Sequence, residues 1–297
     1  MEGRVDNLEA FLHCKKRQKK LSRSRNAGKQ RKKSAGLESS SSPSVKGNHL
    51  KIVHISDWHG QLRTLPSADL YVVSGDMMET YPLLKIQTDK WRRDGIVTYD
   101  PYAHLLGKPQ RQPAGVYVGR IIDPKREAIL QEQWCQQNPF RRSVGISDDA
   151  PVIVVRGNHD FIDLSDWIGG DVWEVTNDPT RTTTLFGLKF GGCRGVNYMM
   201  GEWSDELYGH EFEDRCRNLP DDLDVLVTHS PPIDILDFCG EHCGSRSIRS
   251  YIDGRWYDSK KPLKAHLFGH IHESVGTQKE VDTIFSNAAC SFNVLDL

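Results

Sequence analysis

The sequence predicts an α/β fold, and two observations support this prediction. From about residue 50 onward, short apolar runs rich in β-branched residues recur along the chain, as is typical of buried strands. Several of the segments between these runs carry helical patterns instead. An alternation of strands and helices favours the α/β class over an all-helical or all-strand fold.

The predicted strands are seven short apolar runs. The first is LKIVHIS at 50–56, and PVIVV at 151–155 has the same β-branched character. The other predicted strands cover residues 69–74, 185–192, 223–230, 265–270 and 283–289.

A helix is predicted over 123–137 and a second over 205–218. Asp123 is a candidate N-cap, and Pro124 would occupy the first helical position, where proline is favoured. Two other stretches, 85–122 and 193–212, are rich in aromatic residues and glycine and show no clean period. A connection this long inside a domain is usually functional or a packed insertion.

The charges are distributed unevenly along the 297 residues, whose formal net charge is -1. Residues 1–49 carry 13 Lys and Arg against four acidic residues, a net charge of +9, and the remainder carries -10. The Lys/Arg-rich segment 15–33 could serve nuclear targeting or contact nucleic acid, or it could be a solvated tail. A long apolar run and an apolar leader are both absent from the sequence, so we expect an intracellular, cytoplasmic protein that does not enter a membrane.

The seven cysteines do not predict a disulfide framework, because their number is odd and the chain is not short. The segment CGEHC, which spans Cys239 and Cys243, could suggest a zinc site. Its spacing is loose and a second Cys/His pair does not follow at zinc-finger distance. Reduced thiols in a loop are therefore the preferred interpretation.

Five polar clusters each follow an apolar strand. The carboxyl ends of strands in α/β sheets face a common crevice, so clusters far apart in sequence are expected to meet there. The Asn and His of the third cluster and the two His of the last are the most specific, because a strand end gives them no packing reason. By contrast His54, inside the first strand, is expected to lie in the core or behind the site. The clusters are Asp57-Trp58-His59-Gly60, Gly75-Asp76, Gly157-Asn158-His159-Asp160, His229-Ser230-Pro231-Pro232 and Gly269-His270-Ile271-His272.

The five clusters offer oxygen and imidazole groups but no thiolates, and a set of ligands of this kind suits Mn, Fe, Zn, Ni or Co. The groups are too many for one four-coordinate metal, but two divalent metal ions that share a bridging carboxylate could use them all. Two such cations can clamp an in-line phosphoryl displacement, and a water between them can lose its proton near neutral pH and become the nucleophile. The candidate ligands are Asp57, His59, Asp76, Asn158, His229, His270 and His272.

The order D-x-H, G-D, G-N-H-D, H and G-H-x-H resembles the signature of the calcineurin-like metallophosphoesterases, from about residue 50 to 297. THSPPIDILD, PLKAHLFGHIHESVG and TIFSNAAC resemble more narrowly the small phosphodiesterase-like branch that includes the brain metallophosphoesterase-domain proteins. The segment GDMMET lacks the Asp-Arg-Gly extension of the Ser/Thr protein phosphatases, which argues against protein phosphatase activity.

The resemblance implies a four-layer α-β-β-α sandwich with two packed mixed sheets over residues 50–297. The high charge and low apolar content of the preceding residues predict a disordered basic N-terminal arm at 1–49. The insertions 85–122 and 193–212 would border the site. Their aromatic residues could stack on a base or aryl group of a substrate, or they could merely cap the sheets.

The resemblance also implies individual roles. One metal would be held by Asp57, His59 and His272, and the other by Asn158, His229 and His270, with Asp76 bridging them. His159 would donate a hydrogen bond to the leaving oxygen, and Asp160 would orient His159. Since all these residue types are present, the resemblance implies an active catalyst.

The expected function is hydrolysis of phosphodiester or phosphomonoester bonds by a metal-bridging hydroxide, with phosphodiesterase activity favoured over protein phosphatase activity. The acidic body would repel polyanions, which favours a small phosphoester substrate unless the arm or bound cations intervene. The alternatives are a metal-dependent nuclease, with the basic arm holding DNA or RNA, and a non-catalytic metal-binding scaffold. The oligomeric state is left open.

Overall fold

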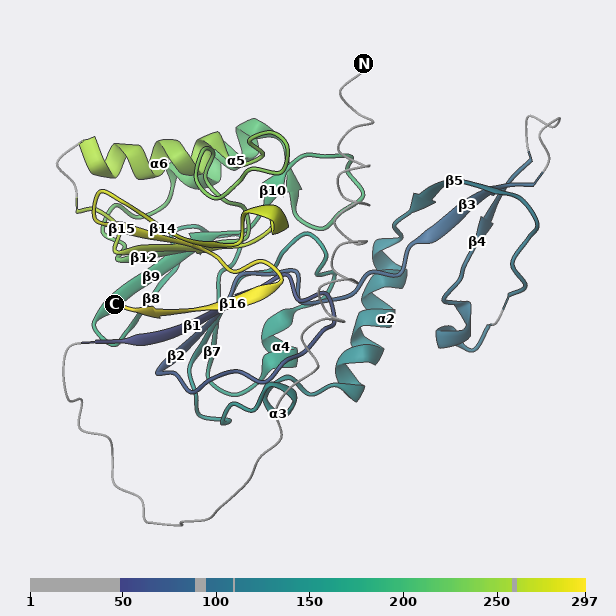
Figure 1. The fold of residues 1–297 in the computed structure, drawn as a ribbon, viewed down its shortest axis with the longest axis horizontal. Coiled ribbons are helices and arrows are strands. Elements are labelled where there is room, and N and C mark those ends of the chain that lie inside the picture. Colours follow the sequence, from purple (N-terminus) through teal and green to yellow (C-terminus); the bar gives the residue numbers. More distant parts are fainter. Residues whose placement is uncertain (1–48, 89–94, 109, 258–260) are drawn as a thin grey trace, which may run out of the picture. The chain divides into compact units, whose positions relative to one another are not determined.

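Two mixed β-sheets stand at the centre of the fold (Figure 1). The structure is a computed structural model that describes residues 49–88, 95–108, 110–257 and 261–297. The predicted disordered arm and its basic segment 15–33 fall outside the described residues. Within these ranges, helices long and apolar enough to span a membrane are absent. The predicted α/β class is confirmed.

The first sheet contains the strands predicted at 50–56, 69–74 and 151–155. Four of its strands run parallel, and β16 pairs antiparallel with β1 along its full length. Its order among the described residues is β16 (Ser291–Asp296), β1 (Lys51–Ser56), β2 (Leu70–Val73), β6 (Val152–Val154) and β7 (Val172–Glu174).

The second sheet contains the strands predicted at 223–230, 265–270 and 283–289. Its four inner strands are parallel, and both of its outer strands are antiparallel to their neighbours. In the described chain its order is β14 (Gly276–Glu280), β15 (Thr283–Asn287), β13 (Ala265–Phe268), β12 (Val225–Thr228), β9 (Leu188–Cys193) and β8 (Thr182–Leu185).

The strand predicted at 185–192 is confirmed over residues 188–192, which belong to β9. It is wrong at its start, because Leu185 ends β8 and residues 186–187 form the turn of a hairpin. Phe186 and Gly187 form its two-residue turn, with φ of 52° and 77°. Two consecutive positive φ values match the twist of the flanking strands and reverse the chain. The apolar character of Phe186 masked this turn in the sequence.

Helix α2 (Pro124–Gln137) matches the predicted helix, and Asp123 caps it as expected. The carboxylate of Asp123 accepts hydrogen bonds from the backbone amides of Lys125 and Arg126 at 3.1 and 3.3 Å. Helix α5 begins four residues later than predicted, because residues 206–207 pair as a short strand. The other α-helices of the described residues are α3 (Phe140–Val144), α4 (Leu164–Ile168), α5 (Gly209–Arg217) and α6 (Arg246–Tyr257).

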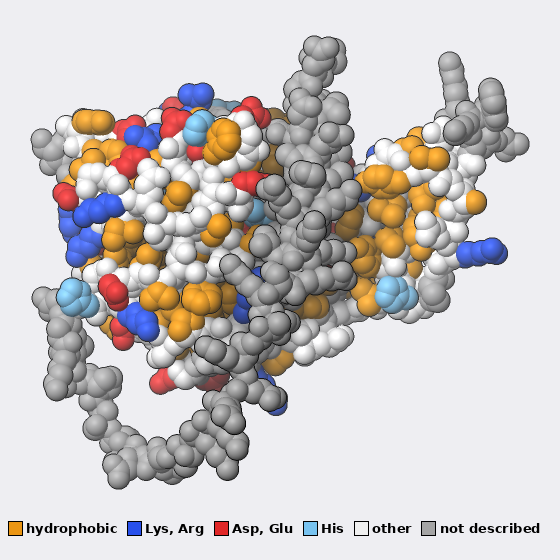
Figure 2. All heavy atoms as spheres, viewed as in Figure 1, with side chains coloured by type: hydrophobic (Ala, Val, Ile, Leu, Met, Phe, Trp, Pro, Cys, Tyr) orange, Lys and Arg blue, Asp and Glu red, His pale blue; other side chains and the backbone are white. Residues whose placement is uncertain are grey.

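The insertion 85–122 contributes a separate antiparallel sheet. Its order is β4 (Ile96–Tyr99), β3 (Leu83–Gln87), β5 (Val116–Ile121), and the turn η1 (Ala103–Leu106) lies between β4 and β5. Figure 2 shows apolar side chains gathered over this sheet, and Val116 and Tyr117 are 56 % and 55 % exposed. Consecutive exposed apolar residues explain why no alternation is visible in the sequence.

Three hydrophobic clusters fill the described part of residues 50–297. Ile52 of β1 joins the cluster that holds residues of both large sheets, whereas its neighbour Val53 faces the cluster of α3 and α4. This alternation is what a strand buried on both faces requires. The third cluster packs α5 and α6, through Phe212 and Ile252, against the far face of the second sheet.

A polar link crosses between the two sheets at His54, as expected for a core histidine. Its Nε2 lies 2.8 Å from the hydroxyl of Ser74, and its Nδ1 lies 2.8 Å from the hydroxyl of Ser286 on β15. Burial lowers the pKa of His54 to about 3, so the ring is neutral at physiological pH. The sheets are thus tied together directly below the loops that carry the site.

Candidate metal centre

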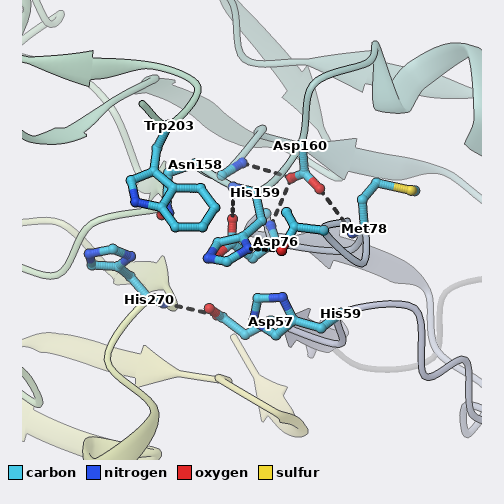
Figure 3. A network of polar contacts seen from close by, with 12 residues as sticks. Asp57, His59, Asp76, Met78, Asn158, His159, Asp160, Trp203 and His270 are labelled. Carbon is cyan, nitrogen blue, oxygen red and sulfur yellow. Dashed lines mark hydrogen bonds and ion pairs between the residues drawn. The ribbon is translucent and has the colours of Figure 1, made fainter. Parts of the chain in front are cut away.

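The five polar clusters meet at the carboxyl ends of the parallel strands, as predicted (Figure 3). They follow β1, β2 and β6 of one sheet and β12 and β13 of the other. Asp57, Asp76, Asn158 and His229 are at most 3 % exposed, so their polar atoms must find partners within the site.

Several ligand candidates occupy left-handed backbone conformations. The φ values are 57° at Asp57, 44° at His59, 53° at Asp76 and 71° at His270. Such conformations are costly for residues other than glycine and concentrate at functional sites. The surrounding backbone maintains them: the amides of Asp57 and His59 donate to the carbonyls of Gly75 and Asp76 at 2.9 and 3.0 Å.

The first group of candidate ligands consists of Asp57, His59 and His272, the set that the resemblance assigns to one metal. His272 Nε2 lies 3.1 Å from Asp57 Oδ1 and 3.4 Å from His59 Nε2. The other carboxylate oxygen of Asp57 accepts hydrogen bonds from the His270 amide and the Ser56 hydroxyl. Burial opposes ionisation of Asp57, but the hydrogen bond with His272 and the charge of His229 hold its pKa below the usual range.

The second group consists of Asp76, His229 and His270, and Asn158 stands beside it. His229 Nδ1 donates to the carbonyl of Ser74 at 2.6 Å, so its Nε2 faces Asn158 Oδ1 at 3.2 Å and Asp76 Oδ2 at 3.4 Å. Burial disfavours a charge on His229, but the Asp76 carboxylate outweighs it and raises the pKa to about 9. The local field therefore attracts positive charge to this position.

Asp76 also belongs to a further group, with His59 and His159. Its carboxylate thus lies between the residues predicted for one metal and those predicted for the other. The Asp76 Oδ1 atom additionally accepts the backbone amide of His159 at 2.7 Å, which fixes the orientation of the carboxylate.

This donor set fits divalent cations. The Nε2 atoms of His59 and His272 face each other at 3.4 Å beside the carboxylate of Asp57. The lone pairs of these two nitrogens would repel each other unless a proton or a metal ion lay between them. The three groups in the described chain that could hold a metal ion contain imidazole nitrogens and carboxylate oxygens. Cys239 and Cys243 are not members of these groups, and the described cysteines are free thiols.

Asp160 has a different set of partners from the predicted one. Its Oδ2 accepts the amides of Asp76 and Gly157 at 2.7 and 2.8 Å, and its Oδ1 accepts those of Met77 and Met78, both at 3.0 Å. We expected Asp160 to orient the His159 ring. These bonds instead orient the backbone of the two loops, because a buried carboxylate with four amide donors is fully used by them.

His159 is 4 % exposed, and its ring packs among four other side chains. Its Nδ1 lies 3.5 Å from the hydroxyl of Thr80, and its Nε2 lies 3.9 Å from Asp76 Oδ2. The rings of His59 and Trp203 lie against it, with centroids at 4.7 and 4.3 Å. These contacts hold the His159 ring beside the Asp76 carboxylate and the His59 ring.

Trp203 is the site residue that the sequence did not single out. It comes from the insertion 193–212, between β10 (Val196–Asn197) and β11 (Glu206–Leu207), and the next amide, of Ser204, donates to the Asn158 carbonyl at 3.0 Å. The only signal was the aromatic richness of this insertion. It borders the site as the resemblance implied.

Two residues without a predicted role are structural supports. Trp58 is 1 % exposed, and its indole nitrogen donates to the carbonyl of Ser291 at 2.8 Å. Arg156 forms ion pairs with Glu174 at 3.9 Å and with Asp205 at 3.8 Å. Arg156 thereby joins the strand that precedes Asn158 to the loop of Trp203.

The family model of the calcineurin-like phosphoesterases matches residues 50–274, and the chain belongs to this family. Family membership and the clustered Asp and His side chains support a metal-dependent phosphoesterase. The resemblance seen in the motifs is thereby confirmed.

Named relatives support the narrower branch as well. The UPF0046 protein K07C11.7 of Caenorhabditis elegans is 24 % identical over 86 % of this chain and 75 % of its own length. The UPF0046 protein T07D4.2 of the same organism is 32 % identical over 85 % of this chain and 59 % of its own length. Human Metallophosphoesterase domain-containing protein 1 is 28 % identical over 34 % of this chain. The chain spans 33 % of that human protein's length.

Gly269→Ala tests how tightly the loops must approach each other. A Cβ at this position would lie 2.0 Å from Ser56 Oγ and 2.2 Å from Asp57 Oδ2, so Asp57 must shift. We expect divalent-metal affinity to fall about 10–100-fold, as when a partner of a metal ligand is removed. Metal titration followed by elemental analysis measures this.

Gly209→Ala is the matched control, because a Cβ at Gly209 meets nothing within 4 Å. Equal metal affinity in the two variants would contradict the assignment of Asp57 as a ligand held in place by Gly269.

Proposed function

We propose that this protein is a binuclear metal-dependent phosphoesterase that hydrolyses small phosphodiesters or phosphomonoesters. Asp57, His59 and His272 hold one divalent ion. Asn158, His229 and His270 hold the other, and Asp76 bridges the two. The position of Asp76 carries this proposal. Its carboxylate lies close to His59 in one candidate group and close to His229 and His270 in another.

Two bound cations would supply Lewis acidity toward the phosphoryl oxygens and toward water. The chain itself supplies the orientation. Asp160 sets the backbone from which Asp76 and Asn158 project, and the hydrogen bond from His229 to Ser74 fixes the tautomer of that ring. The imidazole of His159 can hold a proton at Nε2 and deliver it to the leaving oxygen. Its burial keeps bulk water from competing for that proton.

The segment that follows the bridging carboxylate supports a preference for small phosphoesters over phosphoproteins. Met77 and Met78 are fully buried in the cluster below the first sheet, so this segment belongs to the core. The segment GDMMET also lacks the Asp-Arg-Gly extension of the Ser/Thr protein phosphatases. We therefore retain phosphodiesterase activity as the first expectation.

The architecture is part of the same proposal. One hydrophobic cluster lies between the two large sheets, one packs α3 and α4 on the first sheet, and one packs α5 and α6 on the second. We infer from this order a four-layer α-β-β-α sandwich, with the metal centre at the end where both sheets finish their parallel strands.

A substrate panel tests the proposed activity. The purified protein is assayed with bis-p-nitrophenyl phosphate, p-nitrophenyl phosphate, cyclic AMP, cyclic GMP and single-stranded DNA, each with Mn, Fe, Zn, Ni and Co. We expect metal-dependent hydrolysis of a small ester. Preferred cleavage of DNA, lost on removal of residues 1–49, would favour the nuclease. Tight metal binding without hydrolysis of any member would favour the scaffold.

His159→Ala and Asp76→Ala are expected to separate catalysis from metal binding. His159→Ala should retain both metals and lose about 10²–10⁴-fold in kcat, the range for a general acid. Asp76→Ala should lose both metals, because the bridge is removed. Elemental analysis beside steady-state kinetics distinguishes them, and normal two-metal content in Asp76→Ala would refute the bridging role.

A further inference from the structure

A pair of cysteines lies in the loop between β12 and α6, outside the proposed chemistry. The Sγ atoms of Cys239 and Cys243 are 2.8 Å apart, and both residues are half-buried. The turn between them is exposed at Gly240, Glu241 and His242. Reagents from solution can therefore reach the two sulfurs.

The backbone around the turn brings the sulfurs together. The amide of Cys239 donates to the carbonyl of Glu241 at 3.0 Å, and the amide of Cys243 donates to the carbonyl of Asp237 at 3.2 Å. Asp237 also accepts the Gly244 amide at 2.9 Å and contacts His242 Nδ1 at 2.7 Å. This network sets the sulfur separation, and a disulfide bond of about 2.05 Å needs only a small further movement.

The same loop contacts the short helix that carries one of the proposed metal ligands. The amide of Phe238 donates to the Ser274 hydroxyl at 2.9 Å, and that hydroxyl donates to the carbonyl of Phe238 at 2.8 Å. Ser274 ends the short helix η2 (His272–Ser274), which begins with the proposed ligand His272. Whatever fixes Phe238 therefore also fixes η2.

We propose that Cys239 and Cys243 form a reversible disulfide that fastens this loop against η2 at the rim of the metal centre. The oxidant is a low-molecular-weight disulfide such as oxidised glutathione. One thiolate attacks it, forms a mixed disulfide and releases one glutathione thiolate. The second cysteine sulfur then attacks the first and releases the other glutathione, so two protein thiols become one S–S bond and two glutathione thiols form.

The order of attack follows from the hydrogen bond between the thiols. This bond lowers the pKa of Cys239 and raises that of Cys243. Cys243 also donates its thiol hydrogen to the carbonyl of Glu241 at 3.6 Å. Cys239 is therefore the attacking thiolate, and Cys243 is the resolving residue.

The test uses the full-length protein equilibrated in glutathione buffers of increasing oxidised fraction, followed by alkylation and peptide mass spectrometry. We expect the loss of two alkylatable thiols, both in the peptide 238–244, and recovery with dithiothreitol. Cys193 and Cys216, which are 1 % and 3 % exposed, should remain thiols. Oxidation should also slow the release of metal into a chelator, because η2 is fastened.

Cys239→Ser and Cys243→Ser should each abolish the disulfide and the slower metal release, whereas Cys290→Ser, a half-buried cysteine elsewhere, should preserve both. Stable glutathionylation of Cys239 without an S–S bond would overturn the proposal. So would one zinc ion that is lost in Cys239→Ser while the metal centre remains filled, because the pair would then be a zinc ligand.

A second inference concerns Trp203 and is carried by a different observation. The indole lies against His159 with a centroid separation of 4.3 Å and an interplanar angle of 33°. The guanidinium of Arg120, from β5, stands 4.9 Å from the centroid of the same indole. Trp203 is 8 % exposed, so it has little surface left on which a substrate base could stack.

We infer that Trp203 is a positioning residue for His159, and that Arg120 connects this pair to the sheet of the insertion 85–122. This inference rests on the proposed function, because it concerns the delivery of a proton to the leaving oxygen. An aromatic ring against the imidazole fixes its tilt, and a guanidinium over the indole is a favourable cation–π contact.

The test compares p-nitrophenyl and alkyl esters of the same phosphodiester class. A p-nitrophenolate leaves without much help from an acid, whereas an alkoxide needs the proton. Trp203→Leu should therefore lose at least about tenfold in kcat with the alkyl ester and much less with the p-nitrophenyl ester, with unchanged KM and metal content. Trp203→Phe should restore most of the loss.

Trp167→Leu is the control. Trp167 packs against Phe140 in a hydrophobic cluster that does not contain Trp203, so its loss should not alter the dependence on the leaving group. An equal loss with both esters, or a loss of metal, would overturn the positioning role. Failure of the proposed function itself is distinguishable, because the unmodified protein would then hydrolyse neither ester.

Discussion

The carboxylate of Asp160 accepts hydrogen bonds from four backbone amides that belong to two loops far apart in sequence. Three of these amides follow β2 and one follows β6. A single buried group therefore determines how the two loops cross, and with it the placement of Asp76 and Asn158. Burial and the nearby Asp76 carboxylate raise the pKa of Asp160, so the amide donors must compensate for the cost of ionising it there.

Close contact between the loops that follow β2 and β6 explains the glycines of these two motifs, Gly75 and Gly157. A Cβ on Gly75 would lie 2.4 Å from the amide nitrogen of Gly157, and a Cβ on Gly157 would lie 2.2 Å from Asp76 Oδ1. The polar residues supply the chemistry, while the glycines allow the backbones that carry them to touch. His54 provides the corresponding support from below by joining the two sheets.

Much of the site was predictable because its signals are local. Each cluster follows an apolar strand, and strand ends converge in this fold class, so His229 and His272 could be brought to one site from sequence alone. Trp203 could not, because its position depends on contacts of its loop with Asn158 and Arg120. The backbone role of Asp160 was equally hidden, since amide donors leave no trace in side-chain identity. The strands of the exposed sheet in 85–122 were also hidden, because they lack the alternation of apolar and polar residues that burial on one face would impose.

The left-handed conformations at Asp57, His59, Asp76 and His270 have an evolutionary consequence. Glycine or asparagine would relax the backbone at these positions, so the side chains proposed to bind metal stand there against a local backbone preference for other residues. A lineage released from the need for metal would gain stability by replacing them, and stabilising changes at such sites typically remove activity. Decay of the function would therefore begin at the ligands themselves and would leave the two-sheet scaffold intact.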